Sequence, residues 1–459
     1  ESLMVSRYFQ EADPARIAAE YPVGEAFLKG PAKLSRDVLR ALQEERFEAV
    51  MQRAWQVPFY KRRWSAAGIE SGDINGLDDL AKLPSFSKTD LMESVDAYPP
   101  FGDYHGRDDE FPHAVFHTTS GTTGTPQPLF FGPFDREVQN ALLARGYLLQ
   151  GMRRGDVVHS VYGYGMVNGG HYVREAVAHF TEAMYVPAGT GRDTPTVQQV
   201  EAMQRYGATA IVGFADYIKR LAEAVVEAGL KPGVDIPLRM ISGHIGQEDK
   251  QAISDAWGGA AVYDWYGVGD TGVIAAEGPA QNGLYIWEDA QILEILDAET
   301  GAVLPDGHAG DMCATCLFKT GVYPIIRFDT KDVSTVLPPD PASGIKFRRI
   351  PGFQGRSDNM VKLRGINVYP TAIGAMLDPP PATTGEYYCR LTRAGARDEL
   401  TVVTEVREQG SALQADLSAL LKRGLGVEVL VELAAPGATA PATQVETRQK
   451  PIRLIDERD

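Results

Sequence analysis

The sequence has 459 residues, of which 44% are hydrophobic, so it can build one large core or two to three domains. A formal net charge of -16 argues against a nucleic-acid partner, because a nucleic-acid binder needs a basic surface to displace the counterions of phosphates. No apolar run approaches the roughly 20 residues that span a bilayer, so we expect no membrane partner.

Targeting and redox signals favour a cytoplasmic protein. Glu11, Asp13 and Arg16 interrupt any apolar stretch near the start that would serve as a secretory signal. Three cysteines cannot form a disulfide framework, which is typical of a reducing cytoplasm. Cys313 and Cys316 have the spacing of half a zinc site, but no second pair exists, and the alternation around them predicts a strand.

The first 100 residues are predicted to be mostly helical. Apolar residues recur near helical spacing between positions 39 and 54, with charged residues between them, which predicts a helix with one buried face. Lys88 follows in the segment Ser87-Lys88-Thr89. Taken alone, it is a solvated lysine at the start of a helix.

The segment Thr118 to Pro126 is rich in glycine and hydroxyl side chains. Such a loop presents many backbone N–H and O–H donors and can wrap a phosphate chain, although an ordinary polar surface turn has the same composition. Apolar residues on both sides predict that it joins two short strands. It lacks the lysine of a P-loop, which excludes a P-loop kinase.

From about 100 to 340, short apolar runs alternate with helical patterns, which predicts α/β layering. We expect buried strands at 210–214, 238–242 and 260–263, and a helix at 217–228 that Gly229 ends. Each predicted strand is followed by polar sequence that contains glycine. Because open α/β sheets bind ligands beyond the carboxyl ends of their strands, the site should lie there.

The chain changes character near 355, where glycines and the turn Arg356-Ser357-Asp358 indicate a linker. Beyond it we expect strands at 401–406 and 427–433 with a helix between them, and then a flexible Ala/Pro-rich loop at 434–443. The predicted fold is therefore α/β, with a large multi-layer N-terminal α/β domain (1–357) and a small mobile α+β C-terminal domain (358–459).

Five signals in order carry a family resemblance. They are Tyr266 to Gly272, Ile325 to Asp332, Gly355 to Asp358, Lys362 to Gly365, and Lys450. The ordered set resembles the adenylate-forming superfamily of acyl-CoA synthetases and adenylation domains. Within it the chain is most similar to the phenylacetate-CoA ligase branch, through the stretches Val57–Tyr60, Leu83–Leu91, Tyr162–Gly165, Trp287–Asp289 and Leu363–Pro370.

The resemblance implies an ATP-dependent ligase that uses ATP, Mg²⁺ and coenzyme A. Such an enzyme converts a small aromatic carboxylic acid to an acyl-adenylate and then to a CoA thioester, with release of pyrophosphate and AMP. Phenylacetate, benzoate, hydroxybenzoate and anthranilate types remain open. The resemblance also implies a homodimer.

The resemblance assigns most of the ATP-binding residues to the loop and to the Tyr-Gly segment. The resemblance implies that Tyr266 stacks on adenine and that Asp332, which ends the separate stretch Ile325 to Asp332, holds the ribose hydroxyls. Asp270 stands where the family places a glutamate that binds Mg²⁺. The full ATP-binding set is Ser120, Gly121, Thr122, Thr123, Gly124, Thr125, Asp264, Trp265, Tyr266, Gly267, Asp332, Arg356 and Lys450.

Lys450 matches the family's adenylation lysine, which bridges the carboxylate and the α-phosphate; without the resemblance it is an exposed terminal lysine. Asp358 and Arg356 match the hinge about which the small domain turns between the two steps, although Asp358 is also a good turn-capping residue. After this rotation, Lys362, Arg364 and Gly365 reach the CoA tunnel, where Gly365 lets the pantetheine arm pass.

Two departures from the family pattern concern phosphate charge. Thr125 stands where the phosphate loop normally has a lysine, and Asp270 replaces the glutamate. A unit charge pair about 4 Å apart is worth about 4 kcal/mol at an effective dielectric near 20, so the missing lysine needs a substitute. Lys88 is the first candidate and Arg356 the second.

The acyl pocket is assigned to segments that border it in this family. Two aromatic residues among them suit a flat ring, and His244 stands where relatives often carry an acidic residue. His244 can hydrogen-bond a ring substituent or serve a structural role. The expected substrate-binding residues are Tyr162, Val167, Phe214, Ala215, His244, Gly267 and Lys88.

Two other functions remain open. An enzyme that loads a carrier-protein pantetheine would share the first step, and it differs in not consuming free CoA. A catalytically impaired nucleotide- or acid-binding relative would explain the missing loop lysine, but it would not need Lys450, Asp332 and Asp358 together.

Overall fold

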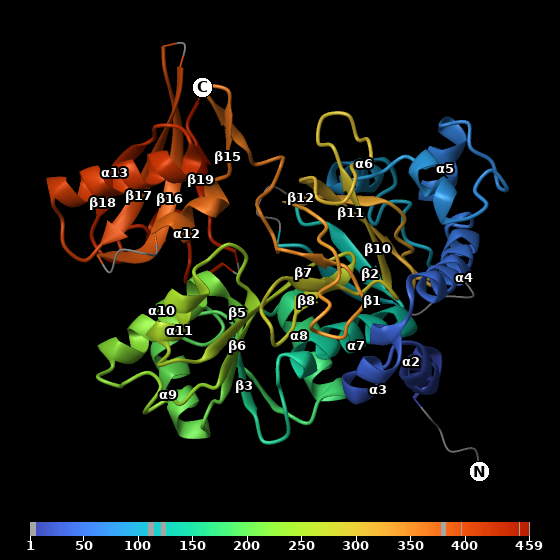
Figure 1. Ribbon diagram of the computed structural model, residues 1–459, viewed down its shortest axis with the longest axis horizontal. Coiled ribbons are helices and arrows are strands. Elements are labelled where there is room, and N and C mark those ends of the chain that lie inside the picture. Colours follow the sequence, from blue (N-terminus) through green and yellow to red (C-terminus); the bar gives the residue numbers. More distant parts are fainter. Residues whose placement is uncertain are drawn as a thin grey trace. The chain divides into compact units, whose positions relative to one another are not determined.

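The computed structural model describes residues 6–108, 114–120, 125–377, 382–395, 397–448 and 450–458. The chain divides into two compact units (Figure 1). The first comprises Glu1–Gly155, Gly165–Met184 and Trp265–Gly352, and the second comprises Asp156–Tyr164, Tyr185–Asp264 and Phe353–Asp459. Because the second unit takes segments from both sides of residue 357, the division at 357/358 stays a prediction.

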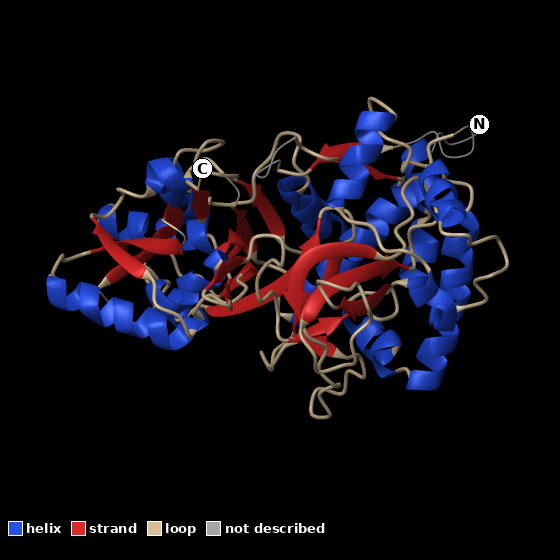
Figure 2. Cartoon of the chain, turned by 90° about the horizontal axis from the view of Figure 1, so that it is seen from above, coloured by secondary structure: helices blue, strands red, loops and turns tan. Residues whose placement is uncertain are grey.

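Helices dominate the start of the first unit, as expected, and they gather near the end labelled N in Figure 2. In α4 (Arg36–Ala54) the Ser35 hydroxyl caps the N-terminus by accepting from the Val38 N–H at 3.3 Å, and Leu39, Phe47 and Val50 are buried on one face. The other helices of this unit are α1 (Arg7–Ala12), α2 (Pro14–Glu20), α3 (Gly24–Lys29), η1 (Pro31–Lys33), α5 (Pro58–Ala66), η2 (Leu77–Lys82), α6 (Lys88–Ala97), α7 (Pro133–Leu149) and α8 (Gly169–Phe180).

The strands of the first unit pair antiparallel. One hairpin consists of β1 (Val115–Thr118) and β2 (Pro128–Phe131). A three-stranded sheet consists of β10 (Gln291–Leu296), β11 (Gly310–Cys316) and β12 (Phe328–Ser334). In a third set, the end of β7 (Ala261–Val268) pairs with β8 (Gly272–Glu277), β8 with β9 (Leu284–Ile286), and β9 with β13 (Arg349–Ile350). The hairpin confirms that the Thr118 to Pro126 loop joins two short strands. Cys313 and Cys316 lie buried in β11, as the alternation predicted.

The second unit contains parallel strands flanked by helices. β3 (Val157–Ser160), β5 (Ala210–Phe214), β6 (Met240–His244) and the start of β7 pair side by side, and α9 (Thr196–Tyr206), α10 (Ala215–Glu227) and α11 (Lys250–Ala256) pack on them around one apolar core. A short strand, β4 (Met184–Pro187), spans the boundary between the units. Gly243 is required here, since a Cβ at that position would lie 1.7 Å from the Gly213 carbonyl oxygen of the neighbouring strand.

The C-terminal part of the second unit is an α+β fold with its own core. Its sheet has the order β18 (Leu430–Ala434), β17 (Arg397–Val406), β16 (Thr383–Ala394), β19 (Leu454–Asp456). The remaining elements are the hairpin β14 (Val361–Leu363) and β15 (Ile366–Val368), η3 (Pro370–Ala372), α12 (Ile373–Leu377), α13 (Ser411–Leu425) and α14 (Ala440–Thr443). Together with the α/β layering, this confirms the predicted fold class.

Several predicted bounds needed correction. The strand expected at 238–242 lies at Met240–His244, and the one expected at 260–263 continues to Val268. The strand expected at 427–433 begins only at Leu430, although Val427 and Val429 before it are buried as the alternation required. The segment 434–443, expected to be a flexible loop, contains the short helix α14, which Pro441 can begin because its missing N–H is not needed in a first helical turn.

A buried ion pair connects several elements of the first unit. Arg145 on α7 and Asp289 have fully buried side chains and make two hydrogen bonds, of 2.9 and 3.1 Å. The Arg145 guanidinium also donates to the Pro22 carbonyl and lies 4.1 Å from the centre of the Phe27 ring. The adjacent Glu288 accepts from Arg36 on α4 at 2.6 Å and from Arg348 at 2.8 Å.

The same segment leads towards the predicted metal carboxylate. After Asp289 the chain enters β10, whose first residue, Gln291, donates its amide to the Thr271 carbonyl at 3.2 Å and to the Val273 carbonyl at 3.3 Å. Thr271 follows Asp270 directly. The Trp287-Glu288-Asp289 stretch therefore supports the position of Asp270 through β10.

No helix in the part of the chain that the structure describes is long and apolar enough to cross a membrane. Among the same residues, no group of three or more His, Cys, Asp or Glu side chains is arranged to hold a metal ion. The Cys313/Cys316 spacing therefore does not form a zinc site within the described ranges.

The Arg145–Asp289 pair yields a stability prediction. We expect Arg145→Met to lower the free energy of unfolding by about 3–5 kcal/mol, because it leaves the Asp289 carboxylate buried and unpaired. Urea denaturation followed by circular dichroism measures the change. The matched control is Arg154→Met, which breaks an exposed pair with Glu182 and should leave the midpoint nearly unchanged. Equal midpoints for the two variants would contradict the prediction.

Candidate functional site

The predicted site residues fall into two groups, one in each compact unit. The first unit holds the hairpin with its loop, Tyr266, Asp270, Asp332 and Lys88. The second unit holds the predicted acyl-pocket rings, the hinge, the CoA residues and Lys450. Each group is described on its own below.

The hairpin of β1 and β2 presents the loop predicted to bind phosphate. Across its base, the Thr119 hydroxyl accepts from the Gln127 N–H at 3.0 Å, and the Thr119 N–H donates to the Gln127 carbonyl at 3.0 Å. Ser120 and Thr125 are exposed at its two ends, whereas Gly121, Thr122, Thr123 and Gly124 lie outside the described residues. Val167, expected in the acyl pocket, forms an isolated bridge with Thr118 at this base.

Tyr266 and Asp332, the predicted adenine and ribose residues, are joined directly. The Tyr266 hydroxyl donates to Asp332 Oδ2 at 2.7 Å, and both side chains are buried. They come from β7 and β12, which are 66 positions apart in the chain. The two neighbours of Tyr266 are also buried or confined: Trp265 is buried, and a Cβ on Gly267 would lie 2.4 Å from the Gly272 carbonyl oxygen.

Asp270 lies in a buried polar network. Its Oδ1 accepts from the Gln127 side-chain amide at 2.6 Å and from the Tyr323 hydroxyl at 2.9 Å, while its backbone carbonyl accepts from Lys319 Nζ at 2.8 Å. Burial raises the pKa of the Asp270 carboxyl and lowers the pKa of the Lys319 ammonium, because both charges are removed from water. The Lys319 ammonium also lies 4.6 Å from the centre of the Tyr323 ring.

The donor atoms of this network suit a hard cation. The Gln127 Oε1 atom is buried without a hydrogen-bond partner in the described structure, next to the Asp270 carboxylate. Magnesium is commonly held by one or two protein carboxylates together with substrate phosphates, so a single carboxylate fits this kind of site. The shorter reach of aspartate is thus compatible with metal binding.

The segment that carries Lys88 is joined to β12, the strand that carries Asp332. The Phe86 N–H donates to the Arg327 carbonyl at 3.0 Å, and the Asp329 N–H donates to the Phe86 carbonyl at 2.7 Å. Lys88 is the first residue of α6, after a capping box formed by Ser87 and Asp90. Lys88 therefore begins a helix, as expected, and the helix start is held beside the β12 backbone.

Three rings of the predicted acyl pocket contact one another in the second unit. Phe214 and His244 end β5 and β6 at the same register position, and their rings stack 4.5 Å apart with an interplanar angle of 11°. The Tyr162 hydroxyl lies 3.0 Å from His244 Nδ1, and the Tyr162 ring packs edge-on against Phe214. These positions lie at the carboxyl ends of parallel strands, where the sequence placed the site.

Two further predicted residues frame these rings. Ala215 is buried and begins α10 immediately after Phe214. Asp264 belongs to β7, and its Oδ1 accepts from the Ile245 N–H at 2.9 Å, which holds the backbone just beyond His244.

Lys450 lies close to the same rings. Its Nζ is 5.8 Å from the centre of the Phe214 ring, a cation–π distance, although 236 residues separate the two in the chain. The structure therefore brings this exposed lysine close to the predicted acyl residues, while its role as the adenylation lysine stays a prediction.

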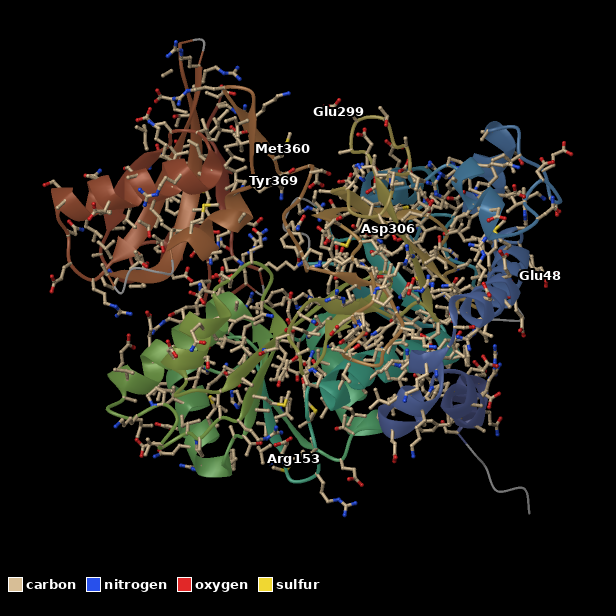
Figure 3. The ribbon with its side chains drawn as sticks, viewed as in Figure 1. Glu48, Arg153, Glu299, Asp306, Met360 and Tyr369 are labelled. Atoms are coloured by element: carbon tan, nitrogen blue, oxygen red, sulfur yellow. The ribbon has the colours of Figure 1, made fainter. Side chains whose placement is uncertain are left out.

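The predicted hinge and CoA residues lie within one body. Arg356 donates to Asp358 at 2.7 and 2.5 Å. Gly355 has φ +139°, and a Cβ there would lie 2.8 Å from the Tyr369 ring, so this turn packs against the end of the β14–β15 hairpin. Figure 3 shows Tyr369 and Met360, which flank that hairpin, close together.

The turn of the β14–β15 hairpin is formed by Arg364 and Gly365, both with positive φ, and Lys362 lies exposed on β14. A Cβ on Gly365 would have no neighbour within 4 Å in the described structure, so its surroundings are open. The Arg364 guanidinium donates to the Glu428 carbonyl at 3.3 Å.

Sequence reasoning missed the residues that support these groups. Gln127 and Tyr323 hold Asp270, and Arg453, three residues after Lys450 in the chain, forms an ion pair with Asp216. Of these residues, only Gln127 could have been noticed in the sequence, because it lies two residues after Thr125, which replaces the usual lysine of the loop. The others lie in apolar or mixed segments whose partners are distant in the chain.

Comparison with known proteins agrees with these observations. Residues 365–458 match the AMP-binding enzyme C-terminal domain family. The chain is 31% identical over 443 residues to a phenylacetate-coenzyme A ligase of Aromatoleum evansii, covering 93% of this chain and 96% of that protein. A phenylacetate-coenzyme A ligase of Pseudomonas putida is also 31% identical, covering 88% and 92%.

A solved structure supports the same relationship. The crystal structure of a 2-hydroxyisobutyryl-CoA ligase in the postadenylation state superposes with a TM-score of 0.83 and 28% identity, covering 93% of this chain and 91% of that one. From the relatives and this structure together, the chain belongs to the phenylacetate-coenzyme A ligase family of adenylate-forming enzymes, the AMP-forming ligases that use ATP and CoA to convert a carboxylic acid to an acyl-adenylate and then to a CoA thioester.

Proposed function

We propose that this ligase activates a small aromatic carboxylic acid, of the phenylacetate, benzoate or anthranilate type, and transfers it to free CoA. The observation that carries this proposal is the cluster of Tyr162, Phe214 and His244 with Lys450 Nζ 5.8 Å from the Phe214 ring. Aromatic side chains favour a flat ring, and a lysine beside them suits the acid's carboxylate. The names of the relatives point the same way.

In the first step the acid's carboxylate oxygen attacks the α-phosphate of ATP, and pyrophosphate leaves. Both reactants are anions, so the site must stabilise negative charge that develops on the phosphate. Lys450 would neutralise the carboxylate–phosphate junction, and the loop from Ser120 to Thr125 would donate hydrogen bonds to the β- and γ-phosphates. Tyr266 and Asp332 would hold the adenosine.

Asp270, supported by Gln127, would hold Mg²⁺, which when bound neutralises phosphate charge. The hydrogen bonds from Gln127 and Tyr323 to Oδ1 orient the Asp270 carboxylate before any ligand arrives. Such preorganisation reduces the cost of assembling the site.

In the second step the CoA thiol attacks the acyl carbonyl and AMP leaves. The part of the chain beyond the Arg356–Asp358 turn would rotate, withdrawing Lys450 and presenting Lys362, Arg364 and Gly365 to the pantetheine arm. The open surroundings of Gly365 support a close approach by the ligand. A homodimer, which the resemblance implies, and a cytoplasmic location, which the cysteine usage and the start of the sequence favour, complete the proposal.

The function is tested by following AMP release with ATP, Mg²⁺ and a panel of acids, with and without CoA. The panel contains aryl acids and also 2-hydroxyisobutyrate, because the similar solved structure is a ligase for that acyl group. Release of AMP that requires CoA and an aryl acid supports the proposal. Pyrophosphate exchange without CoA consumption favours the carrier-protein alternative, and no reaction with any acid favours an impaired relative.

Lys450 is predicted to act in the first step only. We expect Lys450→Ala to lower the rate of ATP–pyrophosphate exchange on the order of 100-fold or more, because a charge donor to the transition state is lost. Thioester formation from a chemically prepared acyl-adenylate and CoA should change little. Equal losses in both half-reactions would contradict the assigned role.

His244 is predicted to influence which ring the enzyme accepts. His244→Leu keeps an apolar surface against Phe214 but removes the imidazole nitrogens. We expect kcat/KM for hydroxy- or amino-substituted aryl acids to fall about tenfold or more, while kcat/KM for the unsubstituted acid changes less. Tyr162→Phe, which removes only the hydroxyl near Nδ1, is the matched control. A uniform loss across the panel would assign His244 a structural role.

Lys88 is predicted to replace the missing loop lysine. The Coulomb estimate of about 4 kcal/mol sets an upper limit of about 10³-fold on the loss of adenylation in Lys88→Ala. Adding Thr125→Lys to that variant restores a lysine at the family position and should recover part of the rate. Unchanged adenylation in Lys88→Ala would overturn the assignment, and Lys61→Ala on α5 serves as the control for loss of an exposed lysine.

A further inference from the structure

Helix α10 bears a row of charged side chains that pair with residues between Arg407 and Arg453, all within the second unit. Arg220 lies 3.4 Å from Glu446, and Glu223 lies 3.4 Å from Arg407. Asp216, one turn earlier, pairs with Arg453. The spacing of Asp216, Arg220 and Glu223 places all three on one face of the helix. This contact is therefore made largely by ion pairs.

Arg453 is the buried member of this row. Its guanidinium donates to Asp216 on α10, to Glu386 on β16 at 3.2 Å, and to the Tyr387 carbonyl. The Arg453 side chain is only 7% exposed, compared with 56% for Arg407 in the peripheral pair. Surface pairs contribute little, whereas a buried, multiply bonded guanidinium holds its partners in one geometry.

The two ends of the Arg453–Asp216 pair lie next to the residues of the first reaction step. Asp216 follows Phe214 by two residues, in the first turn of α10, where the helix dipole favours a carboxylate. Arg453 follows Lys450 by three residues, and its carbonyl accepts from the Cys389 N–H at 2.8 Å, which fixes the backbone there to β16. The pair thus links the segment that carries Lys450 to the segment that carries Phe214.

We propose that Arg453 is a positioning residue for adenylation: its ion pair with Asp216 holds Lys450 over Phe214, and it opens for the thioester step. The proposal rests on the assignment of Lys450 made above. Glu386 lies on β16, and Arg453 directly precedes β19, which pairs with β16, so the guanidinium keeps a partner when Asp216 leaves. An ion pair that opens in this way avoids the large cost of an uncompensated buried charge.

Half-reactions test the proposal. Asp216→Asn should lower kcat for ATP–pyrophosphate exchange about ten- to a hundredfold with little change in KM for ATP, because Lys450 is displaced rather than removed. Thioester formation from a prepared acyl-adenylate should be unchanged or faster. Asp216→Glu, which keeps the carboxylate, should restore much of the exchange rate. Glu223→Gln, which breaks only the peripheral pair with Arg407, is the matched control and should behave as the wild type.

Equal losses in both half-reactions with Asp216→Asn, or no rescue by Asp216→Glu, would assign the pair a purely structural role and overturn the proposal. Unchanged exchange in Asp216→Asn would overturn it as well.

A distance measurement tests the pair without any turnover. Val226 on α10 and Leu430 on β18 are exposed, and the three native cysteines are fully buried, so cysteines introduced at these two positions are the sites that spin labels reach. The same pair of labels is measured in the wild type, in Asp216→Asn and in Glu223→Gln. The distance population of the paired state should be present in the wild type and in Glu223→Gln, and it should be lost in Asp216→Asn. Coincident distributions in all three proteins would overturn the proposal.

The two measurements also separate this proposal from the proposed function. If no acid supports exchange in the wild type, the proposed function fails, whereas the label distances still report whether the Arg453–Asp216 pair holds the two segments together.

Discussion

The buried pair of Arg145 and Asp289 is the interaction on which the first unit most depends. It joins α7 to the Trp287-Glu288-Asp289 stretch, which also binds Arg36 on α4 and leads through β10 to the residue after Asp270. Two charges removed from water need several hydrogen bonds each, and Arg145 obtains them from Asp289 and Pro22. The position of Asp270, the carboxylate proposed to hold Mg²⁺, is thereby connected to the packing of helices far from it in the chain.

Polar groups serve opposite purposes in the two units. Around Asp270 the hydrogen bonds from Gln127, Tyr323 and Lys319 are buried, which strengthens them and holds the carboxylate in one orientation, although Gln127 Oε1 lacks a partner in the described structure. Along α10 the pairs are mostly at the surface, where water can replace either partner at little cost. The contact proposed above to open is the buried pair of Asp216 and Arg453, whose guanidinium keeps Glu386 as a partner.

Under the assignment of Lys88 proposed above, the charge of the missing loop lysine would come from another part of the chain. Thr125 keeps a hydrogen-bond donor but no charge, while the Lys88 segment is held beside β12 by backbone hydrogen bonds through Phe86. Lys88, at the start of α6, would then neutralise phosphate charge that the loop lysine neutralises in proteins with the usual family pattern. The functional requirement is charge near the phosphates, and more than one position in the chain can supply it.

The sequence by itself determined the elements and the family. Short apolar runs predicted the strands β5, β6 and β7, and the ordered short motifs identified the family, because hydrophobic patterns and local loop chemistry are properties of neighbouring residues. The roles of Tyr266, Asp332 and Lys450 stay predictions. Element bounds were less certain, as the start of β18 and the helix α14 show, since the last residues of an element depend on packing. The tertiary structure alone decided which distant side chains meet: Gln127 with Asp270, Tyr162 with His244, and Arg453 with Asp216. These contacts join residues 82 to 237 positions apart, and no local pattern encodes a partner at that separation.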